Sequence, residues 1–126
     1  MNKIINTTNA PAPIGPYNQA VIANGFLFLS GQIAINPESG VVIQSSVAEE
    51  THQVMRNIKA VLLEAGYSFE DVVKTTIFLS DMELFAEIND IYGSYFEKNF
   101  PARETVAVKG LPKGVNVEIS ITAYKS

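Results

Sequence analysis

Residues 100–124, FPARETVAVKGLPKGVNVEISITAY, decide the fold because they contain two strand patterns and the short link between them. From residue 115 onward, apolar residues occupy the odd positions and mostly polar residues the even ones, and this period of two predicts a strand with one buried face. Residues 105–108 predict a shorter strand, and residues 110–114 connect the two. This stretch therefore predicts the C-terminal part of a sheet.

Arg103 and Glu118 are the candidate reactive pair in this stretch. The fork of an arginine can hold a carboxylate through two parallel hydrogen bonds, and a desolvated glutamate can activate water. Both residue types are also ordinary on a solvated surface. A hairpin across residues 110–114 would place the two nearly opposite each other, whereas insertion of the last strand elsewhere in the sheet would separate them. The pattern leaves both arrangements open.

Upstream, the spacing of apolar residues predicts strands first and a helix next. Asn24-Gly25 favours a two-residue hairpin turn between strands at 19–23 and 26–30, with further short strands at 33–35 and 41–43. Apolar residues then recur at helical spacing over 47–65. Ser45 or Ser46 can cap the start of this helix, and Gly66 can end it.

A buried strand at residues 72–79 and a second helix with an apolar stripe over 84–96 follow. The order of elements predicts a single α+β domain over residues 1–126, with a mixed sheet and both helices on one side. The strand at 72–79 has apolar residues on both of its faces. We therefore expect the helix-free face of the sheet to be covered by self-association.

The composition of the chain excludes several kinds of binding and catalytic site. The chain has 126 residues, is 47% apolar and carries a formal charge of −4, so it has no general attraction for nucleic acid or anionic lipid. It has no cysteine and one histidine, so a zinc site or a Cys-His pair lacks ligands, and we predict no metal or cofactor. We expect His52 to lie exposed on the polar side of the first helix. The chain also lacks a signal-peptide or membrane-spanning pattern, which predicts a soluble cytoplasmic protein.

Four further residues have side chains or positions that suit a ligand. Tyr17 follows the rigid PAPIGP stretch, and Ser30-Gly31 ends a predicted strand, where glycine lets a ligand approach the backbone. Asn89 interrupts the apolar side of the second helix. Each also has an ordinary structural interpretation: a buried tyrosine at a turn, a β-bulge and a capped backbone group.

Four segments together resemble the Rid family, the YjgF-type reactive intermediate deaminases. They are APAPIGPYNQA, FLSGQI, INDIYGSYF and FPARETVAVKGLPKGVNVEIS. The resemblance spans nearly the whole chain and implies a fold like that of a Bacillus-type chorismate mutase. In that fold a mixed six-stranded sheet carries two helices on one face. It also implies a homotrimer with three clefts between subunits.

The same resemblance implies an activity, which is hydrolysis of 2-iminopropanoate (2-aminoacrylate) and 2-iminobutanoate to 2-oxo acids and ammonia. Arg103 would clamp the substrate carboxylate, and Glu118 would hold and polarise the attacking water. The positions that match the lining of the family's cleft are Tyr17, Ser30, Gly31, Phe85 and Asn89. Thr105 replaces a residue that is often cysteine or serine in relatives, and its backbone would help to place the water. Glu104 and Ser120 also depart from the usual pattern.

Two other functions are alternatives to this activity. A trimeric regulatory module would bind small carboxylates without turnover and act on a protein partner. An RNA-cleaving translation inhibitor, an activity sometimes attributed to this family, conflicts with the acidic balance of the chain and its single histidine.

Overall fold

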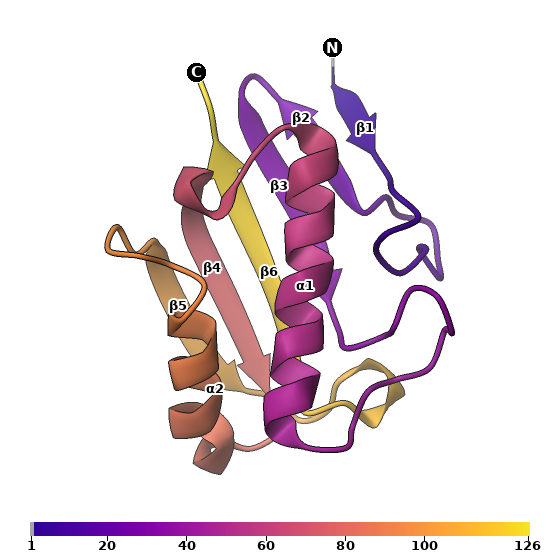
Figure 1. Ribbon diagram of the computed structural model, residues 1–126, viewed down its shortest axis with the longest axis vertical. Coiled ribbons are helices and arrows are strands. Elements are labelled where there is room, and N and C mark those ends of the chain that lie inside the picture. The colour runs from indigo at the N-terminus through magenta and orange to yellow at the C-terminus, as the bar shows by residue number, and fades with distance from the viewer. Residues whose placement is uncertain (1) are drawn as a thin grey trace.

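The computed structural model describes residues 2–126 and contains one six-stranded mixed sheet with two helices on one face (Figure 1), which confirms the predicted α+β class. The strands are β1 (Lys3–Ile5), β2 (Ala20–Ala23), β3 (Phe26–Gln32), β4 (Val72–Leu79), β5 (Ala102–Ala107) and β6 (Val117–Tyr124). The helices are α1 (Val47–Ala65) and α2 (Phe85–Gly93).

The last strand, β6, lies in the centre of the sheet, in the order β1-β2-β3-β6-β4-β5. It runs antiparallel to both β3 and β4, while β5 pairs in parallel with β4 at the edge. The hairpin between residues 103 and 118 therefore does not form, because β4 separates the two strands. The odd-numbered side chains of β6 are all buried, which suits a central strand, whereas β5 stays exposed along most of its length.

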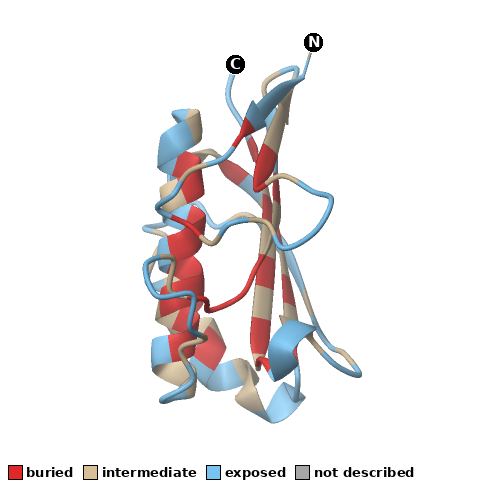
Figure 2. Cartoon of the chain, turned by 90° about the vertical axis from the view of Figure 1, so that its right-hand side faces the viewer, coloured by how far each residue is buried: buried red, intermediate tan, exposed pale blue. Residues whose placement is uncertain are grey.

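The two helices and the sheet form two layers, with buried residues where the layers meet (Figure 2). Local signals set the boundaries of α1 as predicted. The side chain of Ser46 accepts a hydrogen bond from the N–H of Glu49 at the start of α1, and Gly66 ends it with φ of 81°. Asn24 and Gly25 both take positive φ in the β2–β3 turn, as a two-residue hairpin requires.

Three local predictions were wrong in extent, and one strand was missed. The strand predicted at residues 105–108 is β5, Ala102–Ala107. The short strands expected at 33–35 and 41–43 reduce to one isolated bridge, Ile35 to Val42. The second helix ends at Gly93, so Tyr95 and Phe96 leave the helix and pack against the ring of Phe69. Strand β1 was not predicted, because it has three residues, too few for an alternating pattern.

His52 is half-buried rather than exposed. Its Nδ1 lies 2.7 Å from the hydroxyl of Tyr95, which packs over α1 from beyond the end of α2. Within residues 2–126, no cluster of three potential metal-binding His, Cys, Asp or Glu side chains occurs. None of the helices described is long and apolar enough to span a membrane.

The helix-free face of the sheet exposes a group of large apolar side chains. Phe28 is 52% exposed and stacks with Phe26, whose ring centroid lies 4.7 Å from that of the tilted Tyr124 ring. Val106 on β5 is also open on this face. An exposed apolar surface of this kind is typical of an interface, and the self-association expected from the sequence stays a prediction.

Candidate functional site

The eight predicted site residues fall into two groups. The first, which we call the Arg103 group, comprises Phe85, Asn89, Arg103 and Thr105, which together line a narrow space between α2 and the edge of the sheet. The second, which we call the Glu118 group, comprises Tyr17, Ser30, Gly31 and Glu118. It lies where the segment before β2 meets the end of β3 and the start of β6. The cavities lined by the two groups share no residue.

The register of the sheet explains this separation. Side chains of directly paired residues point to the same face. Arg103 pairs with Thr75, which is fully buried on the helix side, whereas Glu118 pairs with Phe78 on the helix-free side. Arg103 and Glu118 therefore point to opposite faces of the sheet within one chain.

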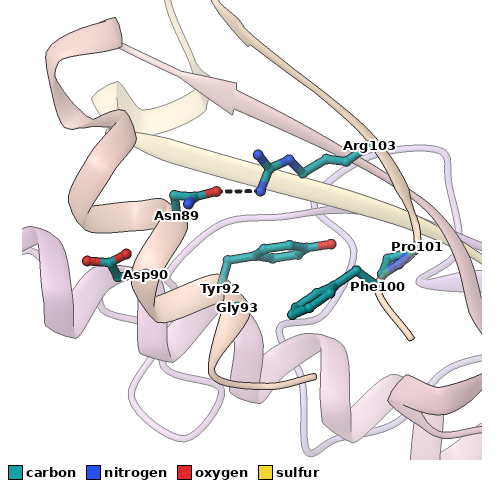
Figure 3. Close-up of a pocket in the computed structure, with 7 residues that line it drawn as sticks. All are labelled: Asn89, Asp90, Tyr92, Gly93, Phe100, Pro101 and Arg103. Atoms are coloured by element: carbon teal, nitrogen blue, oxygen red, sulfur yellow. Dashed lines mark hydrogen bonds between the residues drawn. The ribbon is translucent and has the colours of Figure 1, made fainter. Parts of the chain in front are cut away.

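The side chain of Arg103 is held from several directions (Figure 3). Its Nη1 donates a hydrogen bond of 2.6 Å to Oδ1 of Asn89, and the two side chains face each other across the cleft. The guanidinium carbon lies 5.6 Å from the ring centroid of Phe85 and 5.3 Å from that of Tyr92. Aromatic faces attract a guanidinium and restrict its rotation. Arg103 thus has a defined orientation before any ligand binds.

Tyr92 is a residue of this site that our sequence reasoning missed, because it was assigned only to the apolar stripe of the second helix. Its hydroxyl donates a 2.9 Å hydrogen bond to Oγ1 of Thr75, and burial raises the pKa of Tyr92. The hydroxyl therefore stays protonated at neutral pH and anchors the ring beside Arg103. The available signal was its position three residues after Asn89, which places both on one helical face.

The cleft beside Arg103 has a volume of about 570 Å³. It is lined by Asn89, Asp90, Tyr92, Gly93, Phe100, Pro101 and Arg103. Figure 3 shows the carboxylate of Asp90 pointing away from Arg103, so the cationic group keeps free donors toward the cleft. Such a cleft suits a small anion with an apolar part.

Thr105 lies beside Arg103 on the same side of β5. Its Oγ1 is buried and has no hydrogen-bond partner among residues 2–126. An unpaired buried hydroxyl is costly, and such groups often become satisfied when a ligand or neighbouring chain arrives. The backbone role predicted for this position stays a prediction.

In the Glu118 group, the carboxyl group lies directly over Gly31. A Cβ added at residue 31 would sit 2.9 Å from Cδ of Glu118 and 3.1 Å from Cγ, so only glycine permits this approach. Tyr17 lines the same cavity, which has a volume of about 70 Å³. Ser30 is adjacent, but its hydroxyl donates to the carbonyl of Asn18 at 2.7 Å.

Burial raises the pKa of Glu118, because desolvation disfavours the charged form. Within residues 2–126, no N–H or O–H donates a hydrogen bond to its carboxylate. A carboxylate in these surroundings accepts a proton more readily than an exposed one, which suits a general base.

Comparisons with known proteins cover nearly the whole chain. The family model described as endoribonuclease L-PSP matches residues 7–125. A RutC family protein of Pyrococcus horikoshii is 50% identical, with 99% of both chains covered. Human 2-iminobutanoate/2-iminopropanoate deaminase is 44% identical, with 99% of this chain and 91% of the human protein covered.

Solved structures agree with these sequence matches. YyfA of Yersinia pestis, described as a member of the conserved Rid family, superposes with a TM-score of 0.96 at 48% identity, covering 99% of this chain and 100% of YyfA. Escherichia coli TdcF with bound serine superposes with a TM-score of 0.94 at 38% identity, covering 98% of this chain and 99% of TdcF.

Replacing Gly31 by alanine tests the close approach of Glu118. We expect Gly31→Ala to fold, since the neighbouring atoms belong to a flexible side chain, but to push the carboxyl group out of its buried position. The pKa of Glu118 then falls toward the ordinary value of 4.5, as followed by ¹³C NMR of the side-chain carboxyl. Gly110→Ala is the control, since a Cβ there meets nothing within 4 Å. A Glu118 pKa that is the same in both variants would contradict the assignment.

Replacing Glu118 by glutamine tests the raised pKa through stability. The pKa of Glu118 is near 4.5 in the unfolded chain and higher in the folded protein. Between these two pH values the folded state therefore binds more protons than the unfolded state. Stability from this group is therefore present below 4.5 and lost as pH rises through the folded pKa. We expect Glu118→Gln to raise the melting temperature relative to wild type near pH 7 and to leave it nearly unchanged near pH 4. An equal difference at both pH values would count against desolvation of Glu118.

Proposed function

The chain belongs to the endoribonuclease L-PSP family, which includes the Rid proteins, and from that membership we propose that it hydrolyses small 2-imino acids to 2-oxo acids and ammonia. The observation that carries the proposal is the pair formed by Arg103, whose guanidinium is held in one orientation, and Glu118, a desolvated carboxylate. The relatives named 2-iminobutanoate/2-iminopropanoate deaminase support short-chain substrates.

Arg103 would bind the substrate carboxylate. Asn89 occupies one of its N–H groups, and the rings of Phe85 and Tyr92 restrict its rotation. The remaining donors can form two parallel hydrogen bonds to a carboxylate, a geometry that lysine cannot reproduce. The structure of TdcF is described with bound serine, a small molecule that has a carboxylate and is similar in size to a short-chain imino acid.

Glu118 would then activate water. As the water oxygen forms a bond to the imine carbon, the Glu118 carboxylate takes one proton from it, and the C=N π electrons move to nitrogen. Glu118 then gives that proton to nitrogen, which yields a carbinolamine. Glu118 next takes the hydroxyl proton and passes it to the amino nitrogen, so the C=O bond forms as the C–N bond breaks, ammonia leaves and the carboxylate is regenerated. The net reaction is imino acid plus water to oxo acid plus ammonia. The carbon of an imine is electrophilic, especially when the nitrogen is protonated, so no covalent nucleophile is required.

The complete site would lie between two copies of the chain. Arg103 and Glu118 point to opposite faces of one sheet, so a ligand in contact with both would take Arg103 from one copy and Glu118 from the next. The exposed apolar side chains on the helix-free face give the copies a surface on which to associate. We propose a homotrimer with three such clefts, as the resemblance to the Rid family implies, since head-to-tail contacts of this kind form a ring when the rotation between copies closes.

RNA cleavage, which the family description names, is not the function that these residues favour. The chain is acidic, and its histidine, His52, lines neither the cleft of Arg103 nor the cavity of Glu118. A carboxylate-binding site explains the paired rings and amide around Arg103 more directly.

Substitution of Arg103 tests substrate binding. We expect Arg103→Ala to lower kcat/KM for 2-iminobutanoate, generated in place by threonine dehydratase, at least about 100-fold, because the bidentate anchor is lost. Arg103→Lys should recover only part of the loss. Arg56→Ala is the matched control, since Arg56 lies on α1 and bonds Gln53. Near-normal turnover by Arg103→Ala would exclude Arg103 from the mechanism. A wild-type protein that binds 2-oxobutanoate yet leaves imine decay unchanged would instead be a regulatory module.

Mixing two inactive variants tests the shared site. We expect Arg103→Ala and Glu118→Gln each to be nearly inactive alone, but subunits reassembled together from equal amounts should regain about a quarter of wild-type activity. That is the fraction of clefts in a ring that pair an intact Arg103 with an intact Glu118 from the neighbouring copy. The measurement is imine decay after joint refolding, with each variant refolded alone as the control. No recovery from correctly assembled mixtures would place both residues in one chain's site.

A further inference from the structure

Glu50 is a buried carboxylate that the proposed chemistry does not use. It lies in the first turns of α1 and is 0% exposed. Its Oε2 accepts hydrogen bonds from the backbone N–H of Asn116 at 2.7 Å and of Val117 at 3.2 Å, and its Oε1 accepts one from Nδ2 of Asn116 at 3.0 Å. Within residues 2–126 no lysine or arginine pairs with it. A carboxylate is buried at this cost only where donors replace its water.

The start of β6 needs these acceptors because β3 stops short of it. The last paired residue of β3 is Gln32, opposite Ile119, so Asn116 and Val117 extend past the end of that strand. On the other side, β4 uses the carbonyl of Asn116, which accepts from the N–H of Ser80 at 2.9 Å. The N–H groups of Asn116 and Val117 both donate to Oε2 of Glu50, and they would lose this acceptor without its side chain. The side chain thus takes the place of a missing strand.

The contact between Glu50 and Asn116 is also connected to the region of the Arg103 group. Oδ1 of Asn116 accepts a hydrogen bond of 3.0 Å from the hydroxyl of Ser80. Ser80 precedes Asp81, whose side chain caps the 3₁₀ turn that leads into α2. Glu50 therefore ties together α1, the start of β6 and the entrance to the helix that carries part of the Arg103 group.

We propose that Glu50 is a positioning residue that sets the location of the Glu118 carboxylate through the backbone of β6. Glu118 directly follows Val117, and its carboxyl group sits over Gly31 with contacts too close to tolerate a Cβ. A shift of the Val117 backbone therefore moves the carboxylate relative to Gly31 and to the substrate. This inference rests on the proposed role of Glu118 as the base.

Three variants separate positioning from general stability. Glu50→Gln keeps an oxygen for both backbone N–H groups, and the amide of Asn116 can turn to match it. Glu50→Leu keeps the volume but leaves both N–H groups unpaired. Tyr67→Phe is the control, since it removes a hydrogen bond from a buried side chain to the backbone carbonyl of Gly25 in the β2–β3 turn. All are assayed at a temperature at which each is fully folded and assembled.

With 2-iminobutanoate, we expect Glu50→Leu to lower kcat about 10- to 100-fold, the loss typical of a displacement near 1 Å, with little change in KM, because Arg103 still binds the carboxylate. Glu50→Gln and Tyr67→Phe should stay within about twofold of wild type. If Glu50→Leu fails to fold, Asn116→Ala, which severs the side-chain link and keeps the backbone N–H, should lower kcat about 3- to 10-fold. A wild-type kcat in folded Glu50→Leu, or in Asn116→Ala if the leucine variant does not fold, would overturn the proposal. An equal loss of kcat in Glu50→Gln and Glu50→Leu would overturn it as well.

A second measurement is independent of the proposed reaction. In ¹³C NMR titrations, the pKa of Glu118 should fall further in Glu50→Leu than in Glu50→Gln, because only the leucine variant releases the β6 backbone. A shift shared by both variants reports loss of the Glu50 charge alone and would overturn the positioning role. A wild-type protein that fails to accelerate imine decay overturns the proposed function, and this titration still decides the role of Glu50.

Discussion

The position of β6 between β3 and β4 is the constraint on which the rest of the molecule depends. A central strand is hydrogen-bonded on both edges, so its side chains differ only in the face to which they point. The register that buries Ile119 and its odd-numbered neighbours under α1 also directs Glu118 to the helix-free face. A slip of one residue would exchange the two sets. The core and the location of the candidate base are therefore set by the same pairing.

The edge position of β5 complements this arrangement. Arg103 points to the helix side but lies at an open margin of the sheet, where Asn89, Phe85 and Tyr92 orient it. No rotation of a side chain can bring it across the sheet to Glu118. Under the proposed function, the topology of the monomer itself makes activity depend on assembly, because each copy carries one half of two different clefts.

Glu50 and Glu118 are two desolvated carboxylates with different surroundings. Glu50 accepts three hydrogen bonds from the start of β6, which replace the water lost on burial. Glu118 lies over the backbone of Gly31 with no donor among residues 2–126, so desolvation dominates and raises its pKa. The hydrogen-bond donors around Glu50 are typical of a structural contact. The absence of such donors around Glu118 favours proton transfer.

The sequence alone determined the elements whose signals are local. These include α1 with its Ser46 and Gly66 caps, the Asn24-Gly25 turn, β4 and the alternating core face of β6. It also identified Arg103 and Glu118 as the candidate reactive groups, from the residue types that the chain contains and from its resemblance to the Rid family. Only the tertiary structure decided that β6 inserts between β3 and β4, that these two residues face opposite ways, and that Tyr92 supports Arg103. It alone also decided that Glu50 contacts Asn116 across 66 residues of sequence. Those features depend on which distant segments become neighbours, and neither periodicity nor capping carries that information.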